Sequence, residues 1–337
     1  MDLRNKKILI TGCSFIGFHL LKRLLNEGVA SIRVVNKTNY SKNRILSLGT
    51  IDFQTKDLRD TRYAQQALKD IDVCFHLAAD HGGRGYVDLH QADTATNFLL
   101  DGSVFAAAIK NNIEKLFFAS SGCVYPNFLQ STTSREVLLK ENDVKAPYDA
   151  DNMYGWAKLM GELTLRAYHR EYGLRSAIGR FFTVYGEYAT ESHAVIASIA
   201  KTFTHQDPYT VWGDGTQIRN WTYVEDIVEG ILLSTKKIDD ATPINIGTDE
   251  KTTVKEMIQY VFQYTGFYPK KIKYIKGPTG PLNRVADISK AKTDLNWQPK
   301  YDFRKGLDNT IRWYYSSKDP RTVKKYFNDI LLGNKKI

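Results

Sequence analysis

The chain has 337 residues, of which 42% are hydrophobic, and carries a formal net charge of +10 at pH 7. This length allows a large buried core and about two domains. No window approaches ~18 uninterrupted apolar residues, and the opening "MDLRNKKILITG" runs directly into a predicted strand, so we expect neither a membrane span nor a secretory signal.

Cysteine usage indicates a reducing compartment. Cys13, Cys74 and Cys123 are odd in number, widely spaced and free of any CxxC pair. We therefore expect no disulfide framework, no structural zinc or other metal site, and a cytoplasmic location.

The excess of positive charge does not by itself predict a nucleic-acid-binding protein. The lysines are scattered, and no helix-turn-helix or RNP pattern accompanies them. A solvated basic surface explains this composition best, and it is also compatible with a small anionic substrate.

The first 180 residues alternate between short apolar runs and amphipathic segments. The runs read as strands, nearly all of them apolar, at 6–12, 32–36, 73–79, 115–121 and 175–186. Helices are predicted between them at 15–28, ending at Gly28, at 62–70, around 94–111, and at 153–173. This alternation predicts an α/β fold with a Rossmann-type, doubly wound parallel sheet.

The strand–helix rhythm breaks after about residue 186. A later helix is predicted over "TVKEMIQYVFQYTG", with a capping box between Thr253 and Glu256 and Gly266 as its stop. No repeat or low-complexity linker separates the two parts. We expect residues 1–180 and about 222–250 to form the sheet domain, and 181–221 and 251–330 to form a smaller α/β domain interwoven with it.

A glycine turn follows the first predicted strand. "TGCSFIGFHL" contains Gly12 and Gly17, but the interval is one residue shorter than GxxGxxG and the middle glycine is missing. In a dinucleotide-binding sheet, such a turn brings backbone N–H groups and a helix N-terminus onto a pyrophosphate, here through Ser14, Phe15 and Ile16. A turn with two glycines also occurs in α/β proteins that bind no dinucleotide.

The end of the second predicted strand bears on the choice between NAD and NADP. An acidic residue there would hold the ribose hydroxyls of NAD, but this chain has Asn36 followed by Lys37. An uncharged residue followed by cations can also accommodate the 2′-phosphate of NADP. The sequence therefore does not decide between NAD and NADP. Asp57 and Leu58 are expected beside the adenine ring, and Ala78 is expected at the cofactor after the strand 73–79.

Three more residues complete a catalytic pattern. "YGWAK" places Tyr154 and Lys158 one helical turn apart, and Ser121 ends the strand before them. With the glycine turn, this order resembles the extended short-chain dehydrogenase/reductase superfamily, the NAD-dependent epimerases and dehydratases of nucleotide sugars. The resemblance implies that Tyr154, its pKa lowered by Lys158, takes a hydroxyl proton while NAD(P) takes hydride, with Ser121 bonded to the same oxygen.

Within this superfamily, five segments resemble the GDP-mannose 3,5-epimerase family first and the GDP-L-fucose synthase family second. They are "AADHGGRGYV", "FFASSGCVYP", "YGWAK", "VWGDGTQIRNWTYVED" and "INIGTDE". Both families carry a cysteine two residues after the catalytic serine, which corresponds to Cys123. A thiolate near a cation suits proton abstraction next to a 4-keto sugar, whereas a cysteine outside such a motif is more often a small buried hydrophobe.

The resemblance also implies the remaining site residues. His193, in "ESHAVIAS", corresponds to the acid that returns a proton on the opposite sugar face. Arg219 and Arg284 are expected to hold the nucleotide diphosphate. Gly82, Gly83 and Arg84 would let the backbone approach the hexose, while Asn97 is expected to stabilise the sheet.

The leading interpretation is a GDP-mannose 3,5-epimerase-like enzyme that uses NAD, with NADP as the alternative cofactor, and acts on a nucleotide-diphospho-sugar. One alternative is a GDP-L-fucose-synthase-like NADPH-dependent epimerase-reductase, which His193, Asn36 and Lys37 favour. Another is a non-catalytic nucleotide-sugar binder, suggested by the shortened glycine turn. The resemblance also implies a homodimer formed through the helices 94–111 and 153–171.

Overall fold

A computed structural model describes residues 1–133 and 137–331. Its centre is a seven-stranded sheet with the order β3-β2-β1-β4-β5-β6-β11, in which every neighbouring pair is parallel. The strands are β1 (Lys7–Thr11), β2 (Ser31–Asn36), β3 (Asp52–Thr55), β4 (Val73–His76), β5 (Lys115–Ser121), β6 (Ser176–Phe181) and β11 (Asp240–Ile246). The predicted doubly wound α/β fold is confirmed.

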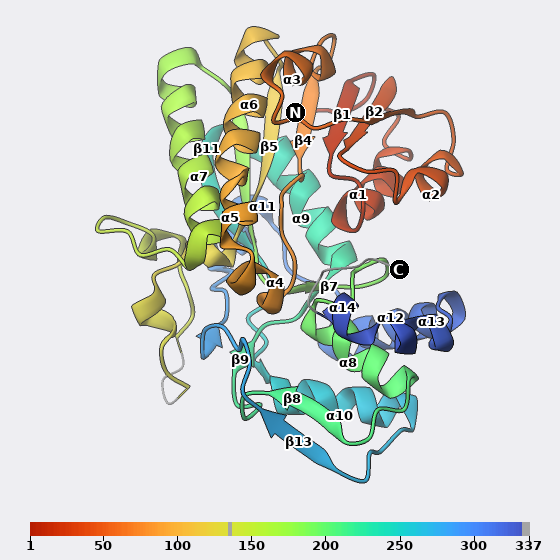
Figure 1. Ribbon diagram of the computed structural model, residues 1–337. Helices are drawn as coiled ribbons and strands as arrows, with labels where there is room; N and C mark the ends of the chain where they lie inside the picture. The colour runs from red at the N-terminus through yellow and green to blue at the C-terminus, as the bar shows by residue number, and fades with distance from the viewer. Residues whose placement is uncertain (134–136, 332–337) are drawn as a thin grey trace.

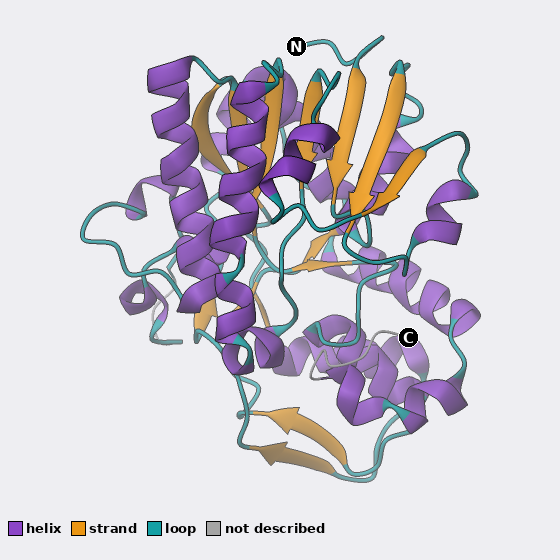
Figure 2. Cartoon of the chain, turned by 45° about the horizontal axis from the view of Figure 1, so that its top comes forward, coloured by secondary structure: helices purple, strands orange, loops and turns teal. Residues whose placement is uncertain are grey.

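Helices cover both faces of the sheet (Figures 1 and 2). The helices on one face are α1 (Ile16–Leu24), α9 (Val224–Lys237) and α11 (Ser289–Leu295). Those on the other are α3 (Thr61–Ala67), α6 (Asn97–Lys110) and α7 (Asn152–Tyr172). Because both faces are covered, β4 and β5 are buried along their whole length, which explains their nearly continuous apolar sequence.

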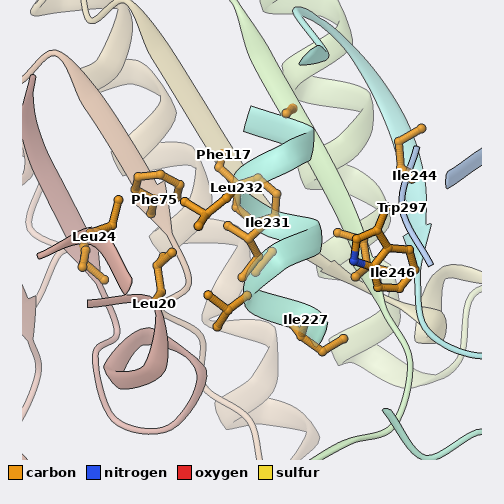
Figure 3. Packing of buried hydrophobic residues seen from close by; sticks show 14 of the residues in the cluster. Leu20, Leu24, Phe75, Phe117, Ile227, Ile231, Leu232, Ile244, Ile246 and Trp297 are labelled. Atoms are coloured by element: carbon orange, nitrogen blue, oxygen red, sulfur yellow. The ribbon is translucent and has the colours of Figure 1, made fainter. Parts of the chain in front are cut away.

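The larger core lies between the sheet and the helices α1 and α9 (Figure 3). Figure 3 labels its principal side chains, which are Leu20, Leu24, Phe75, Phe117, Ile227, Ile231, Leu232, Ile244, Ile246 and Trp297. Each buried side chain of this size stabilises the fold by ~1.5–3 kcal/mol. The sheet and its two flanking layers thereby form the rigid support of the loops at the strand ends.

A smaller region lies beyond the carboxyl ends of the strands (Figure 1). Its helices α8 (Ala194–Phe203), α10 (Val254–Thr265) and α12 (Phe303–Ser317) share a second hydrophobic core. The strands β8 (Tyr209–Trp212) and β13 (Ile272–Ile275) pair in parallel at its outer edge. The predicted capping box of Thr253 and Glu256 and the stop at Gly266 are both present in α10.

Short strands join the smaller region to the main sheet. β7 (Val184–Tyr185) pairs with β10 (Thr222–Tyr223), and β9 (Ile218–Arg219) lies between β12 (Thr252–Thr253) and β14 (Asn283–Arg284). The remaining helices are α2 (Lys42–Leu46), α4 (Arg84–Leu89), α5 (Gln91–Ala95), α13 (Pro320–Lys325) and α14 (Phe327–Leu331), with 3-10 turns η1 (Gly122–Val124), η2 (Asn127–Gln130) and η3 (Glu141–Asp143).

The largest differences between the predicted elements and the structure are at three places. Helix α1 ends at Leu24, and Gly28, with φ 70°, forms the following turn instead of the helix stop. The helix expected around 94–111 is divided at Thr96 into α5 and α6. The strand expected over 175–186 is divided into β6 and β7, which belong to different sheets.

The predicted division into a sheet domain and a smaller domain stays a prediction. The chain leaves the sheet after β6 and returns to it with α9 and β11. One helix of the later segment, α11, packs against α9 and β11. None of the helices in the described part of the chain is long and apolar enough to cross a lipid bilayer.

The buried ion pair between Arg180 on β6 and Glu162 on α7 provides a test of this packing. Arg180 Nη2 lies 2.7 Å from Glu162 Oε2, and both side chains are fully buried. Glu162→Gln should lower the free energy of unfolding by ~3–5 kcal/mol, because it leaves a buried guanidinium without its counter-charge. Urea denaturation measures this, with Asp308→Asn in the exposed Arg312–Asp308 pair as a control expected to change by less than ~1 kcal/mol. An equal loss of unfolding free energy in both variants would show that the buried ion pair contributes no more to stability than the exposed one.

Candidate active site

A cavity of about 700 Å³ opens between the carboxyl ends of the sheet strands and the smaller region. All the residues predicted for the site from the sequence line it. They are Gly12, Ser14, Phe15, Ile16, Gly17, Asn36, Lys37, Asp57, Leu58, Ala78, Gly82, Gly83, Arg84, Ser121, Cys123, Tyr154, Lys158, His193, Arg219 and Arg284. Asn97, which was expected to act structurally, is buried and holds both the N–H and the carbonyl of Asp80.

The shortened glycine turn packs tightly against the end of β4. Gly12 has φ 76°, and a Cβ there would lie 2.6 Å from the backbone of Ala78. A Cβ on Gly17 would lie 2.6 Å from the carbonyl oxygen of Gly12. Helix α1 then begins without a capping side chain, and Ser14, Phe15, Ile16 and Gly17 at this end of the helix line the cavity. This arrangement fits a pyrophosphate despite the missing residue.

Asn36 helps to hold this turn in place. Its Oδ1 accepts the backbone N–H of Cys13 at 2.7 Å, and its Nδ2 donates to Ser41 Oγ at 2.9 Å. The buried amide is therefore engaged within the protein, whereas the exposed Lys37 lines the cavity, as do Lys56 and Arg59.

Ser121, Tyr154 and Lys158 meet where β5 and α7 approach each other. Gly155 makes this possible, because a Cβ there would lie 2.3 Å from the carbonyl oxygen of Cys123. Ser121 Oγ accepts the N–H of Cys123 at 3.1 Å. Lys158 Nζ is buried, has no hydrogen-bond partner in the described part of the chain, and lies 5.9 Å from the centre of the Tyr154 ring. A buried ammonium without a hydrogen-bond partner on a cavity wall fits the hydroxyls of a bound cofactor.

The expected lowering of the Tyr154 pKa by Lys158 is not seen. Burial raises the pKa of Tyr154, the negative charges of Cys123 and Asp101 raise it further, and only the hydrogen bond with Ser121 lowers it. Burial also lowers the pKa of Lys158, against the opposite effect of Asp101. Desolvation therefore outweighs the attraction that the YxxxK spacing predicts.

Arginine side chains lie close to Cys123. Arg284 Nη1 donates to Cys123 Sγ at 3.1 Å, and Arg284 Nη2 donates to Asp151 Oδ2 at 2.8 Å. Arg84 Nη1 donates to the same oxygen of Asp151 at 2.6 Å. Burial would raise the pKa of Asp151, but Arg284 and Arg84 outweigh it and hold that pKa below its usual range.

Arg219 lies beside Arg284 because β9 and β14 pair in parallel with these two residues in register. Among the described residues, its guanidinium donates only to the backbone carbonyls of Ile218 and Thr279. Burial, with repulsion from Arg284 and Arg84, lowers the pKa of Arg219 to about 9. Arg84 also pairs with Asp88, so three guanidinium groups face two carboxylates and leave an unmatched positive charge, which suits an anion.

His193 precedes α8 and faces the loop that follows β4. Gly83 is required by this contact, because a Cβ there would lie 1.6 Å from the carbonyl oxygen of Ser192. The close approach seen at Gly83 is thus between two protein segments, whereas a hexose was expected. The rings of His81 and His193 are 6.1 Å apart, and His81 is 6.4 Å from the Tyr154 ring.

Sequence reasoning missed two residues of this site. Asp151 is the N-cap position of α7, and an aspartate just before a strong helix is a recognisable signal of that position. His81 stands between a strand end and the glycine pair in "AADHGGRGYV", which places it at the edge where parallel sheets bind ligands.

Comparison with known proteins agrees with this geometry. The model of the NAD dependent epimerase/dehydratase family matches residues 8–247. The chain belongs to this family. It is 35% identical over 319 residues to GDP-mannose 3,5-epimerase of Arabidopsis thaliana, a match that covers 92% of this chain and 82% of the relative.

Solved structures share the fold across nearly the whole chain. UDP-glucose 4-epimerase of Thermotoga maritima with UDP-glucose has a TM-score of 0.81 and 26% identity, covering 92% of this chain and 99% of that one. The dTDP-glucose 4,6-dehydratase DesIV of Streptomyces venezuelae with NAD has a TM-score of 0.83 and 22% identity, covering 92% and 97%, which shows the fold alone. The protein is thus an NAD-dependent enzyme of the nucleotide-sugar epimerases and dehydratases, and the alternative of a non-catalytic binder is wrong.

The unmatched charge at Arg219 yields a prediction about anion binding. Arg219→Gln should weaken binding of a nucleoside diphosphate about 10- to 100-fold, because one charge-assisted contact to phosphate is lost. Isothermal titration calorimetry with GDP measures this, and Arg312→Gln on an exposed helix face is the control. If the Arg219 variant bound GDP as tightly as the wild type, the diphosphate would not bind at Arg219.

Proposed function

We propose that the protein is a GDP-mannose 3,5-epimerase-like enzyme, which oxidises a nucleotide-diphospho-mannose at C4, inverts C3 and C5, and reduces C4 again. The observation that carries this proposal is the contact of 3.1 Å between Arg284 and Cys123 Sγ, in the same cavity as Ser121, Tyr154 and Lys158. A 4-epimerase needs no base for carbon-bound protons at C3 and C5, whereas inversion at these carbons does. The 35% identity to the Arabidopsis thaliana enzyme supports the same choice.

The proposed C4 chemistry uses the serine, tyrosine and lysine. NAD, when bound, supplies the hydride acceptor and later the donor. Tyr154 takes the proton of the C4 hydroxyl, Ser121 holds the same oxygen, and Lys158 supplies the positive charge that favours the phenolate. Because burial raises the pKa of Tyr154 in this structure, the phenolate depends on positive charge supplied by its surroundings.

The proposed inversion uses groups on different walls of the cavity. A 4-ketone acidifies the hydrogens at C3 and C5, and Cys123 is positioned as their base, with the Arg284 guanidinium as the partner of the thiolate. His193 approaches from the start of α8 and returns the proton on the opposite face. Arg219 binds the diphosphate, and Arg84 approaches the sugar.

A second candidate is a GDP-L-fucose-synthase-like epimerase-reductase. His193 favours it, because that family has a histidine in the corresponding segment. The two candidates differ in the net reaction, since the reductase consumes one NADPH for each product and the epimerase regenerates its cofactor. Turnover with substoichiometric cofactor separates them.

We also propose a homodimer. Helices α6 and α7 lie side by side over the sheet (Figure 1), and beyond their buried faces several large apolar side chains of α4, α6 and α7 stay exposed. These are Leu89, Phe98, Leu99, Trp156 and Met160, which are 38–62% exposed. A second copy of the chain would cover this patch with the same patch of its own, as a two-fold interface requires.

The role of Tyr154 has a direct test. Tyr154→Phe should slow NAD reduction about 100-fold or more in a single turnover with GDP-mannose, because only the hydroxyl that takes the proton is lost. Circular dichroism and GDP titration should match the wild type. Reduction at the wild-type rate would contradict the assignment.

Inversion can be separated from oxidation by isotope exchange in deuterated water. Cys123→Ser should still reduce NAD but stop deuterium uptake at C3 and C5, because a hydroxyl is far less acidic than a thiol of pKa ~8.5. His193→Asn should retain exchange on one face and lose the inverted product. Mass spectrometry and NMR of the sugar measure both, with the buried Cys74→Ala as the control thiol. Undiminished uptake in Cys123→Ser would show that the cysteine only packs.

The dimer is tested by its mass in solution. Light scattering at micromolar concentration should give twice the chain mass of 38.5 kDa. Leu99→Glu combined with Met160→Glu should give the monomer, because burying two carboxylates in an apolar interface is unfavourable. Tyr268→Glu, at an exposed aromatic of the smaller region, should leave the dimer unchanged. A monomeric wild-type chain would overturn the proposal.

A further inference from the structure

A chain of buried polar groups lies behind Lys158, outside the residues assigned to the reaction. Thr11 Oγ1 lies 2.7 Å from His76 Nδ1, and His76 Nε2 lies 2.9 Å from Asp101 Oδ1. All three side chains are at most 2% exposed. They connect the end of β1, next to the glycine turn, to the middle of α6.

Hydrogen-bond roles fix the proton positions in this chain. An ionised carboxylate only accepts, so the proton of the neutral imidazole is on Nε2 and is donated to Asp101. His76 Nδ1 then accepts the hydroxyl proton of Thr11, whose oxygen accepts the backbone N–H of Ala78 at 3.2 Å. Burial lowers the pKa of His76, which keeps the ring neutral in this arrangement.

The second carboxylate oxygen of Asp101 faces Lys158. The two atoms, Asp101 Oδ2 and Lys158 Nζ, are 3.8 Å apart, which is an ion-pair distance but too long for a hydrogen bond. Neither atom has a hydrogen-bond partner in the described part of the chain. Burying the Asp101 carboxylate without hydrogen bonds to both of its oxygens costs free energy of folding. An apolar side chain at this position would pack at least as well. Stability alone therefore gives a poor account of this residue.

We propose that Asp101 is a positioning residue, which acts through Lys158 to set the protonation states on which catalysis by Tyr154 depends. The chain through His76 and Thr11 holds the carboxylate in place and ties it to the glycine turn. This inference rests on the roles proposed above for Tyr154 and Lys158.

The direction of the effect follows from the groups around Asp101. The titratable side chains that face Asp101 are His76 on β4 and Lys158 on α7. Tyr154 lies one turn before Lys158 on α7, and its pKa also responds to Cys123. Phe105 and Phe118 contribute apolar rings beside His76. The negative charge of Asp101 raises the pKa of both Lys158 and Tyr154. Removing that charge should lower both pKa values.

The first test requires no substrate. In protein labelled with [13Cε]lysine, the Lys158 resonance, assigned by its loss in Lys158→Arg, is titrated by NMR. Asp101→Asn should lower the titration midpoint of Lys158 by about one pH unit. Ser103→Ala, another buried position of α6, should not move it. An unchanged midpoint in Asp101→Asn overturns the proposal. If Asp101→Asn does not fold, Asp101→Thr removes the same charge with a smaller side chain and is judged in the same way.

The second test uses turnover of the NAD-loaded enzyme with GDP-mannose. The proposed roles require Tyr154 to be deprotonated and Lys158 to be protonated, so the two limbs of the kcat profile report this pair. In Asp101→Asn, both limbs should move to lower pH by about one unit, and in Asp101→Glu they should lie where they lie in the wild type. If the role of Asp101 were purely structural, Asp101→Asn would lower kcat without moving either limb. Limbs that stay in place would overturn the proposal. If the wild type does not turn over GDP-mannose, the proposed function fails, and the lysine titration still decides the role of Asp101.

Discussion

The active-site cavity depends on one buried carboxylate, that of Asp151. Asp151 occupies the N-cap position of α7, and its Oδ2 accepts hydrogen bonds from both Arg84 at the start of α4 and Arg284 on β14. Its backbone N–H also binds the carbonyl oxygen of Cys123. Segments that are far apart along the chain therefore converge on a single residue, three positions before Tyr154. The tyrosine and the cysteine proposed for catalysis, and two of the arginines proposed to bind the substrate, are all held near this residue.

The same carboxylate makes an otherwise unfavourable concentration of positive charge possible. Arg84, Arg219 and Arg284 lie close enough that two of them lower the pKa of the third. Asp151 neutralises part of this charge and leaves the rest to the cavity. A site with an uncompensated cation in a desolvated setting attracts an anion more strongly than a fully paired site. Arg284, which also contacts Cys123, links the anion site to the proposed base.

Close backbone approaches give the site its rigidity. Gly12 against Ala78, Gly155 against Cys123, and Gly83 against Ser192 each leave too little room for a Cβ. These contacts join the glycine turn to β4, α7 to η1, and the loop after β4 to α8. The side chains proposed for catalysis are thus attached to segments whose backbones are in close van der Waals contact. Such pre-organisation is what proton transfer between fixed partners requires.

The sequence by itself determined the features that depend on local spacing. Apolar runs of β4 and β5 and the period of α7 predicted the doubly wound sheet, and the capping box at Thr253 predicted the start of α10, because residues within one turn or strand interact directly. The YxxxK spacing and the step from Ser121 to Cys123 likewise predicted which side chains line the cavity.

Only the tertiary structure decided how these groups act on one another. Arg284 reaches Cys123 across 161 positions of sequence, and β9 and β14 bring Arg219 beside Arg284. Asn36 turned out to hold the glycine turn, and burial rather than Lys158 dominates the pKa of Tyr154. Desolvation and Coulomb interactions depend on distances through space and on the exclusion of water, and neither quantity is encoded in the spacing of residues along the chain.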